Sequence, residues 1–348
     1  MSATTTLEAP STLHSALKDW RKIIRPYMKA NHRKAAIQVL NSFLPFIALW
    51  AAMYVSLSYS ILAFFGLAVI NAFFLVRIFI VQHDCGHQSF TASRKWNNFL
   101  GTTASIFTTV PYVYWSRMHN FHHVHNGQME YRGLGDIHFL TKDEYHEMSS
   151  WGKLKYRIFR NNFVQFLIHP VLYILLTLRL PFPRLVGNPN IRRSHWANHL
   201  LILGVYAGLM YWLGIGKFLL VQGTLLFFFG VIAYWFFYVQ HTHEESYNKW
   251  GDDWDHLEAS IYGSTYFKLP QLFMWATGYI GYHHIHHLNS NIPNYNLAAC
   301  ARENPVLQQF VLELSFKDSL CFVHHKLWDE QAEKMISFRE YNFQMAQA

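Results

Sequence analysis

The pattern of apolar and polar residues predicts helices that cross a membrane. Residues 35–76 contain no Asp, Glu, Lys or Arg, and a transmembrane helix needs about 20 consecutive, mainly apolar residues. This stretch is therefore long enough for two spans that are joined by a tight turn near Ser56–Ser60. A second pair of apolar stretches flanks a short segment at 214–217. The spans are expected at about 39–57, 61–81, 199–215 and 218–240.

The composition agrees with a membrane protein. Charged residues make up 14% of the chain, whereas soluble domains have about 25%. Aromatic residues reach 18%, and Trp and Tyr are typical of the two membrane–water interfaces. No internal repeat or long linker divides the sequence, so a single domain is expected over 1–348.

Histidines fall into three tight clusters, and a further pair lies ahead of the third cluster. The clusters are His-Asp-Cys-Gly-His at 83–87, His-Asn-Phe-His-His at 119–123 and His-His-Ile-His-His at 283–287, and the pair is His241 and His243. Side chains three and four positions apart lie on one face of a helix, so each cluster can direct its imidazoles towards one point. Neutral imidazole is a common ligand of Zn, Cu, Fe and Ni.

The number of these histidines indicates two metal ions rather than one. A structural zinc site uses four ligands, which is about half of the imidazoles that the clusters supply. Histidine-rich sites with open coordination positions favour Fe(II) and the activation of O2, and metal–oxygen chemistry breaks unactivated C–H bonds. Because the sequence shows neither a GxSxG motif nor a phosphate-binding loop, a hydrocarbon substrate beneath the apolar helices is indicated.

If the clusters share one site, they must lie on one side of the membrane. Three further apolar stretches, 97–116, 161–178 and 260–282, are then expected not to cross it; the second is interrupted by Pro170 and the third contains Lys268. We therefore predict an all-α integral membrane protein with four transmembrane helices in two hairpins and a cytoplasmic, largely helical di-iron cap. The cap is expected to comprise 82–198 and 241–348, and the lead-in 1–34.

Basic residues set the expected orientation. Seven Lys and Arg residues lie between Lys18 and Lys34, whereas the turns on the opposite side offer only Lys217. Cytoplasmic segments are enriched in Lys and Arg, so both termini and the histidine clusters are expected in the cytoplasm, where Cys85, Cys300 and Cys321 stay reduced. The net charge of +8 is interpreted as contact with anionic lipids and not with nucleic acid, because the basic residues are dispersed among interfacial aromatic residues.

The histidine motifs, with Gln-His-Thr-His at 240–243 ahead of the third, resemble those of the membrane fatty-acid desaturases. The segment Leu-Asn-Ser-Asn-Ile-Pro-Asn-Tyr-Asn-Leu at 288–297 is similar to the one that follows the third motif in bacterial and cyanobacterial acyl-lipid desaturases. Segments 135–141 and 262–270 also resemble the bacterial branch, and the resemblance covers about 35–300. It implies a lipid acyl chain as substrate, two iron ions, O2 and a bacterial inner membrane. Because no cytochrome b5 motif is present, it also implies ferredoxin, flavodoxin or a separate cytochrome as electron donor.

Carried over motif by motif, the resemblance implies iron ligands at His83, His87, His119, His122, His123, His241, His283, His286 and His287. His243 remains the alternative to His241. Residues expected to support the ligands without being among these nine are Asp84, His125, His243 and Asp255. His284 is expected to lie beside the ligands or to be exposed, and His195 to lie at the surface or the membrane interface.

The activity implied by the resemblance is the insertion of a cis double bond into an acyl chain. A fatty-acid or alkane hydroxylase, or a related oxygenase of the same superfamily, is an alternative that the motifs leave open. A histidine-rich metal transporter is a third interpretation, but it would need polar or ionisable residues within the spans. Arg77 is the only charged residue in the four predicted spans, and its positive charge does not suit the passage of a cation.

Overall fold

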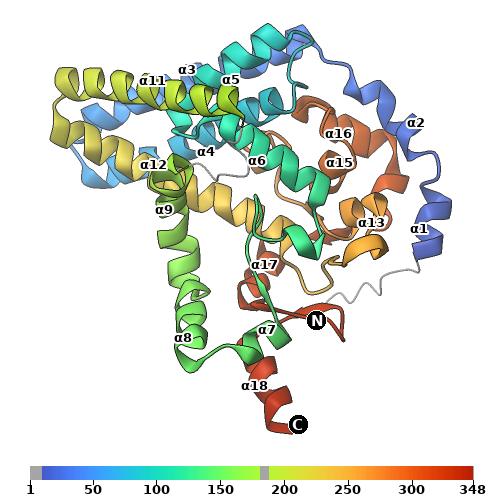
Figure 1. The fold of residues 1–348 in the computed structure, drawn as a ribbon. Helices are drawn as coiled ribbons and strands as arrows, with labels where there is room; N and C mark the ends of the chain where they lie inside the picture. Colours follow the sequence, from blue (N-terminus) through green and yellow to red (C-terminus); the bar gives the residue numbers. More distant parts are fainter. Residues whose placement is uncertain (1–9, 181–187, 348) are drawn as a thin grey trace.

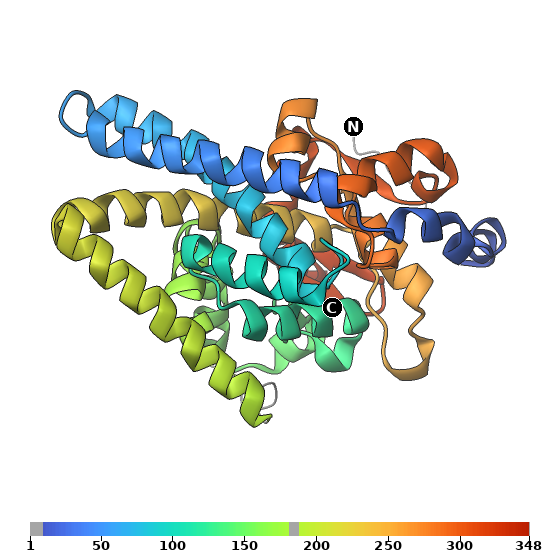
Figure 2. The same cartoon turned by 90° about the horizontal axis from the view of Figure 1, so that it is seen from above.

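The computed structural model describes residues 10–180 and 188–347. Residues 1–9 of the predicted lead-in, 181–187 of the predicted cap and residue 348 lie outside the described residues. Within the described part, two long helical hairpins extend to one side of a mainly helical body, and Figure 2 shows their tips next to each other. This arrangement confirms the prediction of a helical membrane protein.

The first hairpin consists of α3 (His32–Ser56) and α4 (Ile61–Gly86). α4 begins after Ser60, whose side chain accepts a hydrogen bond from the backbone N–H of Ala63 and so caps the helix. α4 packs against α3 on one side and α12 on another, which makes it the most deeply buried of the long apolar helices. Its C-terminal turn enters the body of the protein.

The second hairpin consists of α11 (Pro189–Leu213) and α12 (Ile215–His241). Gly214 joins them with φ of +84°, a backbone conformation that glycine adopts at little steric cost. Large apolar side chains are exposed at this tip, among them Tyr211, which is 93% exposed, and Trp212. Aromatic residues at a hairpin tip suit the interface between lipid and water.

Within residues 10–180 and 188–347, three helices are long and apolar enough to cross a membrane, namely α3, α4 and α12. They correspond to the predicted spans 39–57, 61–81 and 218–240. The remaining predicted span, 199–215, lies in α11, which is not among these three because polar residues such as Asn198 and His199 dilute its apolar stretch. The segments Ser150–Phe159 and Val164–Arg179 together form another candidate that is bent by 54°. Four spans in two hairpins therefore remain a prediction.

The segment between the first two histidine clusters forms two shorter helices. α5 (Arg94–Thr108) packs along α4, and α6 (Tyr112–His125) follows after a sharp turn at Thr109, which has φ of +58°. α5 is 15 residues long, and at 1.5 Å per residue it is too short to cross a bilayer. The chain thus returns to the C-terminal end of α4, as the sequence predicted for 97–116.

The segment 129–179 follows α6, and its helices α8 and α9 run across the direction of the hairpins (Figure 1). Its α8 exposes Trp151, Leu154 and Ile158 on one face, and an exposed apolar face on a helix of this kind suits the membrane interface. The elements of this segment are η2 (Met129–Tyr131), β1 (Leu140–Thr141), α7 (Lys142–Glu147), α8 (Ser150–Phe159), the π-helix η3 (Val164–Ile168), α9 (His169–Leu175) and η4 (Thr177–Arg179).

The remaining elements belong to the cap: α1, α2 and α13 lie away from the hairpin tips, whereas α18 lies beside α7 (Figure 1). At the N-terminus these are α1 (Pro10–Ala16), α2 (Trp20–Ile24) and η1 (Arg25–Met28). After α12 they are η5 (Gly251–Asp253), α13 (His256–Ile261), β2 (Thr265–Phe267), α14 (Gln271–Ala276), α15 (His283–Leu288), α16 (Asn294–Glu303), η6 (Pro305–Gln308), β3 (Leu312–Leu314), α17 (Phe316–Ser319), η7 (Leu320–His324), β4 (Leu327–Asp329), β5 (Lys334–Ile336) and α18 (Phe338–Gln347).

Two small sheets, which the sequence analysis did not predict, join distant segments of the cap. β4 pairs in parallel with β1 and antiparallel with β5, and β2 pairs in parallel with β3. The register places Leu140 opposite Leu327 and Thr265 opposite Leu312. One large apolar core lies within the cap and continues along the inner end of α12, and a second one lies between the hairpins. The histidine clusters lie where these regions meet.

Candidate metal centre

Four helices bring the three histidine clusters and His241 together. His83 and His87 lie at the C-terminal end of α4, one helical turn apart, and His241 is the last residue of α12. α6 supplies the second cluster and the short helix α15 supplies the third. All nine histidines predicted as ligands are buried. Segments that are far apart in the sequence thus converge on one point.

The nine histidines divide into two groups of facing ring nitrogens. In the first group each residue contributes one nitrogen, and these atoms all lie within 4.8 Å of one another: His83, His87, His119, His123 and His286. The second group, by the same criterion, contains His122, His241 and His287. His283 adjoins the second group, since its Nε2 lies 2.8 Å from Nε2 of His241 and 3.2 Å from Nε2 of His287.

Hydrogen bonds fix the orientation of several of these rings. Nδ1 of His83 lies 2.9 Å from Oδ1 of Asp84, and Nδ1 of His87 lies 2.7 Å from Oδ1 of Asn120. Nδ1 of His241 lies 3.0 Å from the backbone oxygen of Gly263. Because an oxygen acceptor requires the proton on Nδ1, Nε2 of each ring is left as an acceptor that can bind a metal.

The donor set fits metal ions. Nε2 of His87 and both ring nitrogens of His286 are buried without a hydrogen-bond partner among the described residues, and such buried polar atoms are costly unless something binds them. Burial lowers the pKa of His122 to about 3 and holds the pKa values of His286 and His287 well below the ordinary range. The rings are therefore neutral at physiological pH, as metal ligands must be.

The structure places the other predicted residues as follows. Asp84 contacts the predicted ligand His83, whereas Asp255 caps α13 by accepting a hydrogen bond from the N–H of Glu258 and lies 3.4 Å from His14. His125 is held by Gln128 at the end of α6. His243 is buried beside Phe322, outside both metal groups. The geometry thus brings His241 to the metal centre and does not bring His243 or Asp255 there.

Two other histidines are more buried than the sequence suggested. His284 is fully buried, so the alternative of an exposed side chain is wrong; α15 is enclosed on all sides, and even the face turned away from the metal groups packs into the cap. His195, expected at the surface or interface, is 1% exposed because its ring packs against Tyr114. Neither lies in a metal group.

The sequence analysis missed two residues that position the ligands. Asn120 lies within the second motif and contacts His87 of the first. Trp115 lies one helical turn before His119 and stacks on its ring, with ring centroids 4.6 Å apart and planes at 15°. The i to i+4 spacing of Trp115 and His119 was a signal in the sequence. The contact between Asn120 and His87 depends on how α4 meets α6, and no local pattern encodes it.

An apolar cavity of about 350 Å³ reaches the metal centre between α4, α9 and α12. His83, His119 and His283 form part of its wall, and Asp136 and His138 add polar groups. Most of the remaining wall is apolar and comes from α4, α9 and α12, including Val76, Phe79, Ile174, Phe229, Ala233 and Phe237. This apolar lining suits a hydrocarbon.

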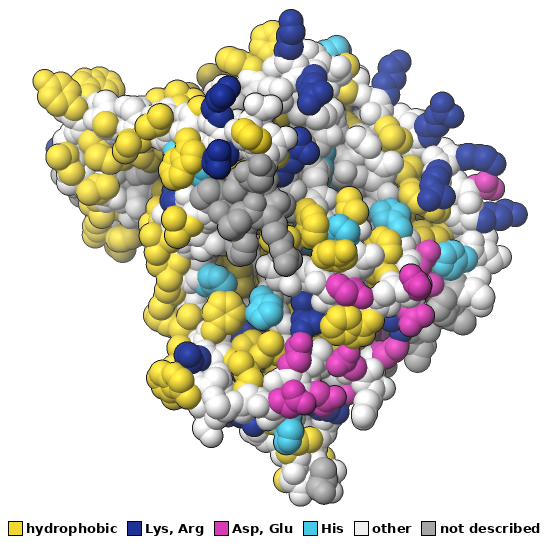
Figure 3. Space-filling view, viewed as in Figure 1, with side chains coloured by type: hydrophobic (Ala, Val, Ile, Leu, Met, Phe, Trp, Pro, Cys, Tyr) yellow, Lys and Arg dark blue, Asp and Glu magenta, His cyan; other side chains and the backbone are white. Residues whose placement is uncertain are grey.

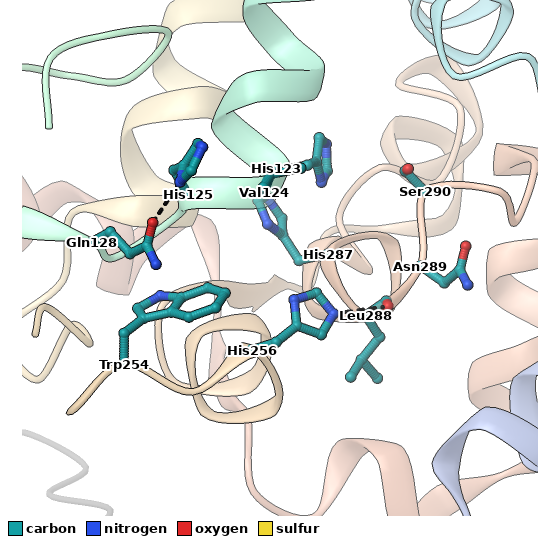
Figure 4. Close-up of a pocket in the computed structure, with 10 residues that line it drawn as sticks. All are labelled: His123, Val124, His125, Gln128, Trp254, His256, His287, Leu288, Asn289 and Ser290. Atoms are coloured by element: carbon teal, nitrogen blue, oxygen red, sulfur yellow. Dashed lines mark hydrogen bonds between the residues drawn. The ribbon is translucent and has the colours of Figure 1, made fainter. Parts of the chain in front are cut away.

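A second hollow of about 450 Å³ reaches the metal centre from another side (Figure 4). His123 and His287 lie at its inner end, one from each metal group. Figure 4 shows Trp254 and His256 across the hollow from these two rings. Val124, His125, Gln128, Leu288, Asn289 and Ser290 complete the lining. The metal centre therefore lies between an apolar cavity and a more polar, more open hollow.

Comparison with known proteins identifies the family. The sequence profile of the fatty acid desaturase family matches residues 59–314, a range that includes every histidine of the metal centre. The chain belongs to the fatty acid desaturase family. It is therefore an oxidoreductase of lipid metabolism, with membrane-spanning helices and histidine clusters that can hold metal.

Individual relatives agree with this family. This desaturase is 38% identical over 328 residues to a fatty acid desaturase of Bacillus subtilis. The aligned residues cover 94% of this chain and 92% of the relative. It is 26% identical over 302 residues to an sn-1 oleoyl-lipid 12-desaturase of Picosynechococcus, covering 85% and 83%. It is 28% identical over 249 residues to an sn-1 acyl-lipid omega-3 desaturase (ferredoxin) of Synechocystis, covering 67% and 65%.

Proposed function

We propose that this desaturase introduces a cis double bond into an acyl chain of a membrane lipid, with O2 as oxidant and two electrons from a separate donor protein. The apolar cavity beside His83, His119 and His283 carries the proposal. It is bounded by α4, α9 and α12, where a chain can enter from the bilayer. The names of the cyanobacterial relatives support a lipid-linked substrate and a ferredoxin donor.

The metal proposed for the site is iron, with two ions per chain. His83, His87, His119, His123 and His286 would hold one ion, and His122, His241, His283 and His287 the other. Bound there, the two irons would supply the oxidising power that removes hydrogen from an unactivated C–H bond.

The side chains of the protein contribute position and surroundings. Asp84 and Asn120 hold the Nδ1 protons of His83 and His87 and aim the opposite nitrogens inward. The apolar walls from α4 and α12 place two neighbouring methylene groups beside the ligand histidines, and this positioning lowers the barrier. Overall, O2, two electrons and two protons enter, the chain loses two hydrogens, and one double bond and two waters form.

The proposed orientation puts the metal centre and both termini in the cytoplasm, in a bacterial inner membrane. The turns at 57–60 and 214 would lie on the opposite side. The basic residues before α3 support this orientation, because cytoplasmic flanks of membrane spans are enriched in Lys and Arg. The common location of all three histidine clusters at the cap end of the long helices also supports it.

The test is expression in a bacterial host whose membrane contains only saturated acyl chains, followed by profiling of its lipid acyl chains. We expect a new monounsaturated chain whose double-bond position is found by mass spectrometry after derivatisation. The His287→Ala variant serves as the inactive control. Purified enzyme is then given a phospholipid in vesicles, an acyl-CoA or an acyl-carrier protein thioester. A hydroxylated product, or conversion of the thioesters alone, would contradict the proposal.

A further inference from the structure

We propose that a negatively charged, one-electron carrier protein docks on the outer surface of residues 18–25, which comprise α2 and its flanks, beside the hollow in Figure 4. We call this the donor face and define it by Lys18, Trp20, Arg21, Arg25 and His256. Electrons would pass from the donor face through Trp20 and His256 to the metal centre. The inference rests on the proposed function, because it concerns the donor that this function requires.

The first observation is that the hollow reaches both metal groups at once. His123 belongs to the first group and His287 to the second, and both line the hollow. The apolar cavity reaches the centre at other ligands, namely His83, His119 and His283. A protein that approaches the hollow can therefore exchange electrons while an acyl chain occupies the cavity.

The second observation is a short series of contacts from the donor face to a ligand. The ring centroids of Trp20 and His256 are 6.0 Å apart. Nε2 of His256 lies 3.3 Å from the backbone oxygen of Leu288, and Leu288 directly follows the ligand His287. Electron transfer slows steeply with distance, so this packed series is a favourable route. The guanidinium of Arg21 lies over the outer side of this series, 4.6 Å from the ring centroid of Trp20.

The third observation is the sign and position of the charge. Lys18, Arg21, Lys22 and Arg25 are exposed, with Asp19 as the one acidic residue among them. Figure 3 shows Lys and Arg gathered along the edge of the molecule over α1 and α2. Figure 2 shows these helices at the end opposite the hairpin tips, away from the expected bilayer. A basic surface in this position suits an acidic protein better than a lipid surface.

A separate acidic group would orient this partner. Glu130, Asp252, Asp253 and Glu330 are exposed around the loop that precedes Trp254, and Glu130 and Glu330 bind Gly251 and Trp250 of this loop. Figure 3 shows the Asp and Glu side chains gathered mainly below the basic edge. An acidic patch on the carrier would be attracted to α2 and repelled by the loop, and such complementarity selects one orientation.

The electron balance is simple. In each encounter the cofactor of the carrier is oxidised by one electron and the metal centre is reduced by one electron. No covalent bond to the carrier forms. Two encounters therefore supply the two electrons that one turnover requires, and the oxidised carrier leaves each time.

Binding is tested with the iron-loaded, full-length protein in lipid nanodiscs and a purified acidic [2Fe–2S] ferredoxin as the probe. The Lys18→Glu/Arg25→Glu variant changes two exposed side chains that make no hydrogen bond or ion pair among the described interactions. We expect its affinity for ferredoxin to fall about tenfold or more at low salt. The matched Asp252→Asn/Asp253→Asn variant should bind as well as or better than the wild type. High salt should remove these differences.

The electron route is tested by stopped-flow reduction of the metal centre with pre-reduced ferredoxin. Trp20→Leu should slow this reduction, while Trp20→Phe restores much of it. Rates are compared at saturating ferredoxin, and iron content and reduction by dithionite should not change, which separates an electron-transfer defect from weaker binding and from misfolding. Unchanged ferredoxin-driven reduction in Trp20→Leu would overturn the route.

Two further outcomes separate the inference from its alternatives. If Lys18→Glu/Arg25→Glu binds ferredoxin normally but loses affinity for phosphatidylglycerol vesicles, the basic face contacts lipid and the donor face is overturned. If ferredoxin reduces the wild-type centre and the charge variants behave as expected, but no double bond forms, the donor face stands and the proposed function fails. The two hypotheses therefore fail in distinguishable ways.

Discussion

Asp84 holds its neighbour His83 and at the same time ties α4 to α16. Oδ1 of Asp84 lies 2.9 Å from Nδ1 of His83, and Oδ2 accepts a hydrogen bond of 2.6 Å from the backbone N–H of Asn294. One buried carboxyl group therefore orients the proposed metal ligand and fixes the segment that follows the third histidine motif. Partners of this kind adjust both the geometry and the basicity of metal-bound imidazole.

Replacing Asp84 by Asn should weaken metal binding without removing a ligand. An amide is a poorer acceptor for the Nδ1 proton of His83, and loss of such partners typically costs 10–100-fold in metal affinity or activity. Iron content after dialysis against a graded series of chelator concentrations measures the change. Asp252→Asn, at an exposed carboxylate, is the matched control. Wild-type iron retention in Asp84→Asn would contradict the role assigned to this contact.

Removing a single ligand imidazole should abolish activity while the protein stays in the membrane. The decisive comparison is His241→Ala with His243→Ala, because only His241 faces the metal groups. We expect His241→Ala to lose both desaturation and bound iron. His243→Ala should retain iron, although it leaves space in a buried site and should lower the melting temperature. Full loss of iron from His243→Ala together with normal iron in His241→Ala would reverse this assignment.

A bulky side chain in the apolar cavity should change the product rather than the metal content. Ala233 lies on α12 in the wall of the cavity, and Ala233→Phe adds a ring where the chain is expected to lie. We expect lower activity on long chains, a shift towards shorter ones, or a displaced double bond, each measured by profiling of lipid acyl chains. Leu219→Phe, at an exposed position of the same helix, should change none of these. An unaltered profile in Ala233→Phe would show that the substrate lies elsewhere.

Cysteine labelling tests the topology. In a background without Cys85, Cys300 and Cys321, single cysteines at 58 and 215 should react with an impermeant reagent added from outside. Single cysteines at the exposed positions 130 and 188 should react only after the cell is opened. Labelling of position 188 from outside would mean that the bent pair Ser150–Phe159 and Val164–Arg179 crosses the membrane. The number of spans would then need revision.

Lys326 should make stability depend on pH. Burial lowers its pKa to about 7, and its Nζ donates to Asn162 and Gln165 at 2.8 and 3.0 Å. Between about pH 7 and the unfolded pKa of about 10.4, the unfolded chain binds the proton and the folded protein does not, so the free energy of unfolding rises with pH. We expect the melting temperature of the wild type to rise relative to Lys326→Met from pH 7 to 9.5.

The control for this pH dependence is Lys268→Met. Lys268 is exposed and paired with Glu313 at 2.6 Å, and the ion pair raises its pKa. A raised lysine pKa gives stability that is present below the unfolded value and is lost only as the pH rises through the folded value. The difference between wild type and Lys268→Met should therefore change little in the same window. If the melting temperatures of Lys326→Met and Lys268→Met changed with pH in the same way relative to the wild type, the assignment of the pH dependence to Lys326 would be contradicted.

The sequence predicted the parts of this protein that are encoded locally. Apolar length indicated α3, α4 and α12, and the spacing of histidines on single helices indicated which imidazoles can converge. The requirement that all clusters share one site also led to the expectation that 97–116 does not cross the membrane, and α5 with its 15 residues is too short to do so. The choice of His241 over His243 followed from the family resemblance, and the geometry supports it.

Other features depend on contacts between distant segments and left no local signal. Asp255 was expected to support the ligands but caps α13 instead. Asn120 of α6 orients His87 at the end of α4. The short strands β1 and β4 pair across most of the chain, and two or three residues are too few to show an alternating pattern. The burial of His195 likewise arises from packing against α6 and not from its own apolar surroundings in sequence.

In two pairs of consecutive histidines, the two members belong to different metal groups. His122 and His123 are joined by one peptide bond, as are His286 and His287, yet one member of each pair faces each group. The separation of the two ions would thus be set by covalent bonds in two dipeptides. Movement of whole helices in a fluid bilayer could widen the cavity or the hollow and leave this spacing almost unchanged. The distance between the two metal groups would then stay constant while the volumes of the surrounding cavity and hollow change.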